Sequence, residues 1–158
     1  MIKLIWAMDK DNLVGKDNLL AWHYKEDLLF FKKMTKDKEV LMGDNTYDSL
    51  QGYYKGKPLP FGETHVATLK RMFIPNVDMV NNLIPFISNF PKDKELFVIG
   101  GKTIYDLTMP YADILYVTVI DASHEGNVYF YPDLSDFELI ESNKSGILDF
   151  RTYQRVKK

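Results

Sequence analysis

Cysteine is absent from this chain of 158 residues. Without a thiol there is no disulfide, no thiolate metal site and no cysteine nucleophile. A strong charge of one sign is also missing, because the formal net charge is only −2 at pH 7. No basic field would therefore attract nucleic acid or an anionic membrane, and we expect neither as a partner.

Long hydrophobic runs are lacking as well. No stretch approaches the roughly 18 apolar residues that a membrane span needs. The apolar start at residues 2–8 is too short for a signal peptide and is followed at once by charged residues. We therefore expect a cytoplasmic protein. The length and the apolar content of 46% predict a single domain over residues 1–158, with its own core and no linker.

Several functional motifs are missing too. The chain contains no G-x-G-x-x-G fingerprint, no G-x-S-x-G nucleophile turn and no P-loop. His23, His65 and His124 do not have the spacing of metal ligands, either with each other or with nearby acids. We therefore expect no metal site and interpret all three histidines as structural or surface residues.

Strand and helix patterns alternate along the first two thirds of the chain. Short apolar runs predict strands at residues 2–8, 39–43, 64–69, 77–82, 94–101 and 112–121. Helical patterns cover residues 25–36, 44–50, 83–90 and 102–110, with Asp44 or Asn45 able to cap the second. Residues 9–20 form a long polar loop, and alternation around residues 143–146 predicts a final hairpin. The result is an α/β fold with a mainly parallel central sheet, flanking helices and C-terminal antiparallel edge strands.

Two strand-to-helix turns could hold a nucleotide. In "FVIGGKTIY" a buried strand leads into Gly100 and Gly101 and then a helix, so a ligand could approach the backbone closely and meet free N–H groups. "VLMGDNTY" repeats this pattern, with Asn45 and Thr46 at the helix start. Two such turns on one sheet could grip a dinucleotide. Two ordinary strand-to-helix turns without a ligand are about as probable.

An acidic pair, Glu26 and Asp27, opens the first helix in "KEDLLFF". Acids favour the first turn of a helix, where they face the positive end of its dipole, so an exposed acid is the simpler interpretation. If Asp27 lies on the buried face with Leu28 and Phe31, its carboxylate must find polar partners. Thr118, inside the strand pattern "LYVTVID", is one candidate partner, although a β-branched residue is also ordinary in a strand.

These pieces occur together in one order, and that order resembles the dihydrofolate reductase family along nearly the whole chain. The matching segments are "LIWAMDKDNLVGKDNLLAWHYKEDLLFFKKMT", "VLMGDNTYDSL", "PLP", "FVIGGKTIYDL", "LYVTVIDASHEG" and the terminal hairpin. The resemblance implies reduction of 7,8-dihydrofolate to tetrahydrofolate, by hydride transfer from NADPH to pterin C6 and protonation at N5. It also implies antifolate inhibitors, and a monomer is the simplest expectation.

The resemblance also implies roles for substrate residues. Asp27 would bind the pterin ring and stabilise its cation, Thr118 would hold Asp27, and a water near Trp22 would supply the proton. Backbone at Ile5, Ala7 and Ile99 would border the pterin and nicotinamide rings. The slot for the aryl group would be formed by Leu28, Phe31, Leu50 and Leu59.

The cofactor contacts implied by the resemblance lie in four segments. A closing loop contributes Val14, Gly15, Asn18 and Leu19, beside Ala7 and Ile99. The first glycine turn contributes Gly43, Asp44, Asn45 and Thr46. The adenosine side contributes Thr68, Leu69 and Lys70. The second glycine turn contributes Gly100, Gly101, Lys102, Thr103, Ile104 and Tyr105.

Three positions depart from the family pattern. The arginine that usually clamps the substrate carboxylate is replaced by Gly62, which leaves Lys32, Lys55 or Lys57 as point charges and predicts binding weaker by about 1–3 kcal/mol. Asp44 stands where a basic residue often meets the NADPH phosphate, so NADH is also possible. Ala21 replaces a proline before Trp22, which loosens the closing loop slightly.

Three functions therefore stay open from the sequence. The first is a working dihydrofolate reductase, which could also accept unconjugated pterins. The second is a reductase of the same fold that acts on another heterocycle, such as a riboflavin-pathway pyrimidine, although that reaction does not need Asp27. The third is a nucleotide-binding paralogue without turnover, which the glycine at position 62 favours and Asp27, Trp22 and Thr118 disfavour.

Overall fold

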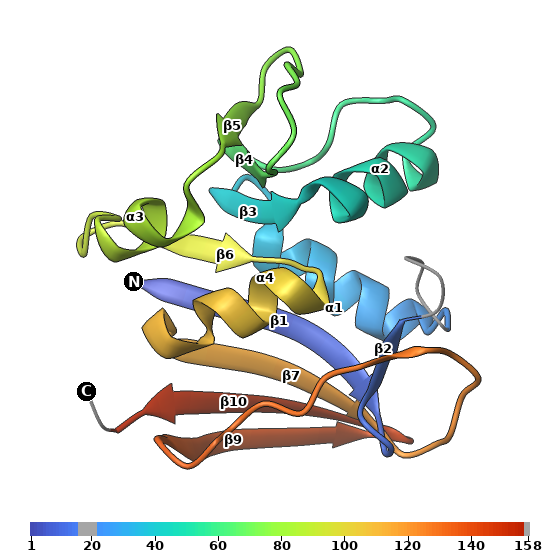
Figure 1. Ribbon diagram of the computed structural model, residues 1–158. Coiled ribbons are helices and arrows are strands. Elements are labelled where there is room, and N and C mark those ends of the chain that lie inside the picture. Colours follow the sequence, from blue (N-terminus) through green and yellow to red (C-terminus); the bar gives the residue numbers. More distant parts are fainter. Residues whose placement is uncertain (16–21, 157–158) are drawn as a thin grey trace.

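A computed structural model describes residues 1–15 and 22–156. An eight-stranded sheet crosses the molecule in the order β5-β4-β3-β6-β1-β7-β10-β9 (Figure 1). The six strands from β5 to β7 are parallel, and β10 and β9 are antiparallel. The strands are β1 (Ile2–Asp9), β3 (Val40–Gly43), β4 (Thr64–Ala67), β5 (Asp78–Val80), β6 (Leu96–Val98), β7 (Ile114–Ile120), β9 (Phe137–Ser145) and β10 (Leu148–Arg155). The predicted α/β fold is confirmed.

Helices cover both faces of this sheet. They are α1 (Lys25–Thr35), α2 (Asp44–Tyr53), α3 (Leu83–Ser88), α4 (Lys102–Thr108) and the 3-10 helix η1 (Met109–Tyr111). One face packs against Phe31 of α1 and Leu50 of α2, and the other packs against Phe86 of α3 and Ile104 of α4. Because both faces are covered, the inner strands are mostly apolar, as in β6, where all three side chains are buried.

A second, two-stranded sheet corrects the prediction of a continuous loop over residues 9–20. Leu13–Gly15 forms β2, which pairs with β8 (Val128–Tyr129). The buried carboxylate of Asp9 accepts hydrogen bonds from the backbone N–H groups of Leu13 and His124, at 3.0 and 2.9 Å. Asp9 therefore ties the end of β1 to the start of β2 and to the loop that precedes β8. β2 and β8 are too short for their pairing to be visible as alternation in the sequence.

The remaining differences are local. The N-cap of α2 is Gly43, without a side-chain cap, so Asp44 and Asn45 do not cap this helix as predicted. The terminal hairpin turns at Gly146, where φ is +60°, whereas residues 143–145 continue the strand. β10 lies between β7 and β9, so only one strand of the hairpin is at the edge. Within the described residues, no helix has the length and apolar character to cross a membrane.

Gly62 lies where another segment of backbone passes very close. A Cβ at this position would lie 2.8 Å from the carbonyl oxygen of Asp37. Hydrogen bonds fix the approach: Gly62 N–H donates to Lys38 O at 2.9 Å, and Asp37 N–H donates to Pro60 O at 3.0 Å. Any side chain at position 62 would force apart the two segments that these hydrogen bonds hold together. This is a physical reason for glycine at a position where the family usually has arginine.

We predict that Gly62→Ala lowers the free energy of unfolding by about 1–3 kcal/mol, because the new methyl group would overlap backbone that cannot move freely. The matched control is Gly52→Ala. Gly52 is helical, and apart from its own helix backbone and chain neighbours no described atom lies within 4 Å of an added Cβ, so alanine should stabilise α2 by about 0.5 kcal/mol. Urea unfolding of the two variants measures both effects. Equal stability of the two variants would contradict the close contact at Gly62.

Candidate active site

A deep cleft opens at the carboxyl edge of the parallel sheet. It has a volume of about 970 Å³ and is lined by residues of α1, α2 and α4, among other segments. Ligands of open α/β sheets bind at this edge, because the loops after the strands diverge there. The cleft brings together most of the predicted site residues: Ile5, Ala7, Val14, Gly15, Asp27, Leu28, Phe31, Lys32, Gly43, Asp44, Asn45, Thr46, Leu50, Thr68, Leu69, Lys70, Ile99, Gly100, Gly101, Lys102, Thr103, Ile104, Tyr105 and Thr118.

Asp27 is the inward member of the acidic pair. It lines the cleft from the first turn of α1 and accepts a hydrogen bond from the hydroxyl of Thr118 on β7. Burial raises the pKa of the Asp27 carboxyl above its ordinary value, although the bond from Thr118 opposes the shift. Glu26 is exposed, and its carboxylate accepts a hydrogen bond from Ser145 at 2.9 Å. The structure therefore favours the buried-carboxyl interpretation of Asp27 and the solvated one for Glu26.

The two glycine turns lie side by side, because β3 and β6 are neighbours in the sheet. Gly43 N–H donates to Gly100 O at 2.8 Å, and a Cβ on Gly43 would lie 3.1 Å from the side chain of Ile104. Gly100 has φ of +130°, and a Cβ there would lie 3.3 Å from the Thr46 hydroxyl oxygen. These contacts require small residues, and they leave a backbone-lined cradle between α2 and α4.

The outer cleft beyond the first turn of α2 is polar. Asp44 accepts a hydrogen bond from the Thr68 hydroxyl at 2.7 Å, and the Lys70 ammonium lies 3.9 Å from the same carboxylate oxygen. Asp44 is thus engaged within the protein, and Lys70, which is largely exposed, remains available to solvent. An anion at this position would meet one cation and one acid.

The opposite end of the cleft carries apolar and tyrosine side chains. Leu28, Phe31 and Leu50 line it from α1 and α2. The Lys32 ammonium lies 3.4 Å from the Tyr53 hydroxyl oxygen and over the Tyr53 ring. This end therefore combines a flat apolar slot with one point charge.

Some predicted residues do not line the cleft. Trp22 is buried with Leu13 in a separate cluster, and its ring centroid lies 5.0 Å from that of His124. Leu59 packs against the same core cluster as Phe31 and Leu50. Asn18 and Leu19, like Ala21, lie outside the described residues.

Other lining residues were not predicted from the sequence. Trp6 lines the cleft from β1, and its buried indole nitrogen has no hydrogen-bond partner among the described residues. Tyr105 was predicted only as a cofactor contact, but its buried hydroxyl also donates to Ile5 O at 2.7 Å and so ties α4 to β1. The further lining residues are His23, Phe30, Ser49, Tyr53, Tyr54, Ala67, Val80, Asn81, Leu83, Leu107 and Val128. Tyr53 and Tyr54 lie just beyond the predicted end of α2 at residue 50, so their place on the cleft could not be inferred.

These features define a class of protein: a nucleotide-dependent enzyme of an open α/β sheet, with a half-buried acid in its ligand cleft. The family model "Dihydrofolate reductase" matches residues 1–155. The chain belongs to the dihydrofolate reductase family. The predicted family and the predicted nicotinamide-dependent reductase activity are confirmed.

Individual relatives agree with this assignment. Dihydrofolate reductase of Bacillus subtilis is 37% identical over 146 residues, which cover 91% of this chain and 84% of that protein. Dihydrofolate reductase of Mycoplasma genitalium is 31% identical over 160 residues, which cover 98% of this chain and 100% of that protein. The solved dihydrofolate reductase of Enterococcus faecalis, complexed with NADP(H) and RAB-propyl, superimposes with a TM-score of 0.85 at 28% identity, over 99% of this chain and 97% of that one.

We predict that Asp27→Asn raises the melting temperature at neutral pH. A carboxyl whose pKa is raised on folding contributes stability below its unfolded pKa, and this contribution is lost as pH rises through the folded pKa. The increase in melting temperature caused by Asp27→Asn should therefore be small near pH 4 and become larger toward pH 7. Thermal unfolding across this range measures it, with Glu26→Gln as the exposed control. A gain that does not vary with pH would contradict a buried carboxyl.

Proposed function

We propose that this protein reduces 7,8-dihydrofolate to 5,6,7,8-tetrahydrofolate, with NADPH as the hydride donor. The observation that carries the proposal is the carboxyl of Asp27, which is half-buried, lines the cleft and is held by Thr118. When bound, the cofactor would supply the hydride that reaches pterin C6. The chain itself contributes binding, orientation and control of protons.

Asp27 recognises the pterin in this proposal. Its carboxylate can accept from the ring N3–H and the 2-amino group together, as a bidentate pair. The same negative charge stabilises the pterin cation that forms when N5 takes a proton from water near Trp22. Backbone of β1 and the end of β6 would border the rings: Ile5, Ala7 and Ile99.

The rest of the substrate would extend along α1. Leu28, Phe31 and Leu50 form the aryl slot, with Leu59 behind them. Lys32, beside Tyr53, is the cation best placed to meet the substrate carboxylate, whereas Lys55 and Lys57 are exposed and not among the described residues that line the cleft. A single ammonium cannot form the forked pair that arginine forms, so the glutamate part should contribute less to binding than the pterin does.

The backbone cradle fits a pyrophosphate. Gly43, Gly100 and Gly101 expose main chain where any Cβ would meet Thr46 or Ile104. The start of α2 adds N–H groups, because no side chain caps this helix. Val14 and Gly15 would cover the nicotinamide. The remaining contacts proposed for the cofactor are Asn18, Leu19, Asp44, Asn45, Thr68, Leu69, Lys70, Lys102, Thr103 and Tyr105.

Lys70 is the reason to prefer NADPH over NADH. Its ammonium reaches the edge of the cleft where the 2′-phosphate of the adenosine ribose would lie. Asp44 opposes that phosphate, but its carboxylate is engaged by Thr68, which limits the repulsion. We therefore expect NADPH to be preferred and NADH to be accepted as the poorer donor.

Antifolate inhibitors would compete for the same cleft, because their protonated diamino rings offer Asp27 the same pair of donors. A reductase of a pyrimidine would not depend on Asp27, and a paralogue without turnover would bind NADPH without oxidising it. The role of Asp27 therefore separates the proposed reaction from both alternatives. A monomer remains the simplest expectation.

The proposal predicts that Asp27→Asn lowers kcat/KM for dihydrofolate by roughly 10²- to 10⁴-fold at neutral pH. The loss should shrink at low pH, where the substrate arrives already protonated. NADPH oxidation, followed by its near-ultraviolet absorbance, measures both rates, and Glu26→Gln should match the unmodified protein. Unchanged activity of Asp27→Asn would disprove the role, and no turnover by the unmodified protein despite NADPH binding would favour the paralogue.

A second prediction concerns the choice of cofactor. Lys70→Gln should lower kcat/KM for NADPH by roughly fivefold and leave NADH unchanged, because about 1 kcal/mol of charge attraction is lost at an exposed site. Asp44→Asn should shift the ratio toward NADPH by a similar factor. Lys36→Gln, on the exposed end of α1, is the control. If neither variant alters the ratio of the two cofactors, the 2′-phosphate does not lie between these side chains.

A further inference from the structure

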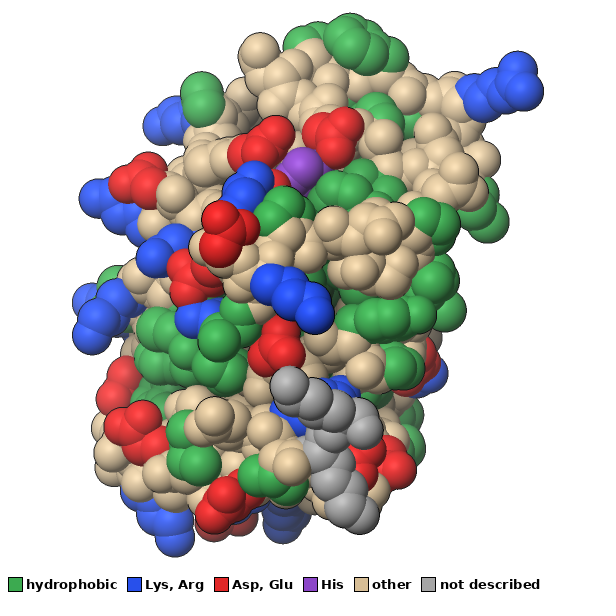
Figure 2. Space-filling model, turned by 90° about the vertical axis from the view of Figure 1, so that its left-hand side faces the viewer, with side chains coloured by type: hydrophobic (Ala, Val, Ile, Leu, Met, Phe, Trp, Pro, Cys, Tyr) green, Lys and Arg blue, Asp and Glu red, His purple; other side chains and the backbone are tan. Residues whose placement is uncertain are grey.

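A cluster of ionisable side chains lies at the amino edge of the sheet, opposite the active-site cleft. Glu39 immediately precedes β3, Glu63 immediately precedes β4, and His65 and Asp78 lie in β4 and β5. Figure 2 looks onto this edge of the sheet and shows acidic side chains and a lysine gathered around one imidazole. The strands are parallel neighbours, so their starts bring together residues that are far apart in the chain.

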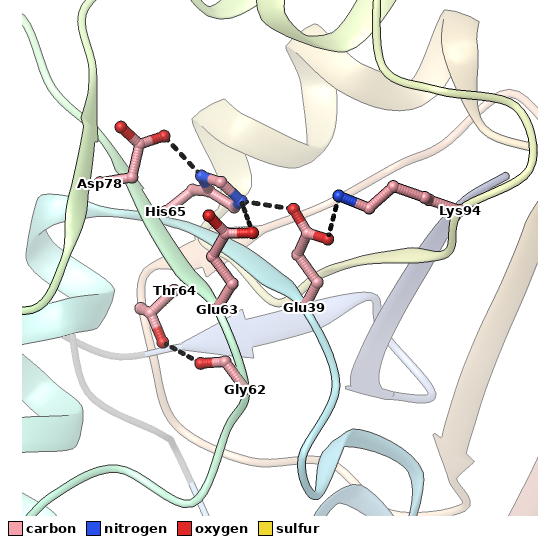
Figure 3. Close-up of polar contacts among 7 residues, drawn as sticks. All are labelled: Glu39, Gly62, Glu63, Thr64, His65, Asp78 and Lys94. Carbon is pink, nitrogen blue, oxygen red and sulfur yellow. Dashed lines mark hydrogen bonds and ion pairs between the residues drawn. The ribbon is translucent and has the colours of Figure 1, made fainter.

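His65 is the buried centre of this cluster. Its side chain is 5% exposed, its Nδ1 lies 2.6 Å from Asp78 Oδ2, and its Nε2 lies 2.7 Å from Glu39 Oε2 (Figure 3). Glu63 Oε2 lies 4.0 Å from the same Nε2. When Nδ1 donates its hydrogen to Asp78, the ring presents the Nε2 lone pair to two carboxylates. Such an arrangement directs three donor atoms toward one point, and Asp78 orients the ring from behind, as in carboxylate–histidine–metal groups.

The three donor atoms are close to the spacing of a tetrahedral metal site. Metal–ligand distances of about 2.0–2.2 Å place neighbouring ligand atoms roughly 3.3 Å apart. The Glu39, Glu63 and His65 donor atoms lie within 4.8 Å of one another. The Glu39 carboxylate would need to withdraw from Nε2 by about 0.6 Å and the Glu63 carboxylate to approach it by about 0.7 Å. Glu63 is 60% exposed, so its side chain can make this movement.

The surroundings supply space and one opposing charge. A hollow of about 330 Å³ beside the cluster is lined by Glu39, Glu63, His65, Phe86, Asn89, Phe90, Pro91 and Lys94, which leaves room for water to complete a coordination shell. The Lys94 ammonium lies 3.0 Å from Glu39 Oε1, the carboxylate oxygen that faces away from His65. Lys94 therefore leaves Oε2 free to bind a metal, but its positive charge weakens the attraction for a cation.

We propose that Glu39, Glu63 and His65 form a binding site for a divalent transition-metal ion of the Zn²⁺ class, with Asp78 as the residue that orients His65. Such an ion would link the starts of β3, β4 and β5. The site is separate from the reductase cleft and would act on stability rather than on turnover. No spacing in the sequence indicates it, because the three ligands come from segments that meet only in the folded sheet.

Zinc and cobalt titrations of the chelator-treated protein test the proposal. Zn²⁺ should bind with one-to-one stoichiometry in isothermal calorimetry and raise the melting temperature, and Co²⁺ should give the visible absorption of a tetrahedral complex. Glu63→Gln should weaken the affinity for Zn²⁺ at least tenfold, and Asp78→Asn should weaken it by about tenfold or more. Lys94→Gln should tighten it several-fold, because an opposing charge is removed.

Glu138→Gln, on the exposed strand β9, is the matched control and should bind zinc as the unmodified protein does. Glu63 is mostly exposed, so its variant should fold, which keeps the test independent of changes at buried His65. Absence of saturable binding at millimolar Zn²⁺ would overturn the proposal and leave His65 as a structural residue held by carboxylates. Binding that is equally strong in Glu63→Gln would also overturn it, because the ion would then lie elsewhere.

Discussion

The pairing of β1 with its parallel neighbours is the constraint on which the active site depends. β1 pairs with β6 from Ile2 to Leu4 and with β7 from Lys3 to Asp9, which places Ala7 opposite Thr118 in the register. This register brings the Thr118 hydroxyl to the carboxyl edge at the level where α1 begins, so that Asp27 has a donor inside the cleft. A slip of one residue would turn Thr118 to the other face of the sheet and leave a buried carboxyl without a partner, which is costly. The register of β1 and β7 is therefore required both for burial of the strands and for the contact between Thr118 and Asp27.

The carboxyl groups at the two edges of the parallel sheet differ in how their partners compensate for burial. At the carboxyl edge Asp27 has one hydroxyl partner, and its burial is compensated only in part, which keeps its pKa raised. At the amino edge burial also disfavours the charge of Glu39, but hydrogen bonds from His65 and Lys94 lower the pKa of its carboxyl below the ordinary value. The Asp27 carboxyl can still recognise an incoming cationic ring, whereas the Glu39 carboxylate is held by His65 and Lys94 when no metal is bound. The proposed metal ion would replace the contact between Glu39 and His65, whereas a ligand in the cleft would add a partner to Asp27.

The sequence predicted best those features that depend on local pattern. Buried runs and glycine turns identified β1, β3, β6 and both cradle turns, since short apolar strands and small residues have a direct local cause. The orientation of Asp27 against Glu26 stayed open, because a first-turn acid is favourable on either face of a helix. The β2–β8 pair was missed because two or three residues carry no detectable period. His65 was interpreted as structural, and its contacts with Glu39 and Asp78 could not be seen, since they depend on which strands become neighbours.

Gly62 shows how a backbone contact can determine substrate recognition. In this chain the segment after Pro60 is hydrogen-bonded to residues 37 and 38, so tightly that no Cβ fits at position 62. An arginine at position 62 would force the two segments apart. The hydrogen bonds that Asp37 and Lys38 make with the segment of Pro60 and Gly62, just after the end of α1, would then be lost. The chain keeps the contact and has Lys32 at that end of the cleft, one turn before the end of the same helix. In the proposed function, recognition of the distal carboxylate by a flexible point charge would be the consequence of this fixed loop. More of the binding free energy would then come from the pterin end, where Asp27 is proposed to act.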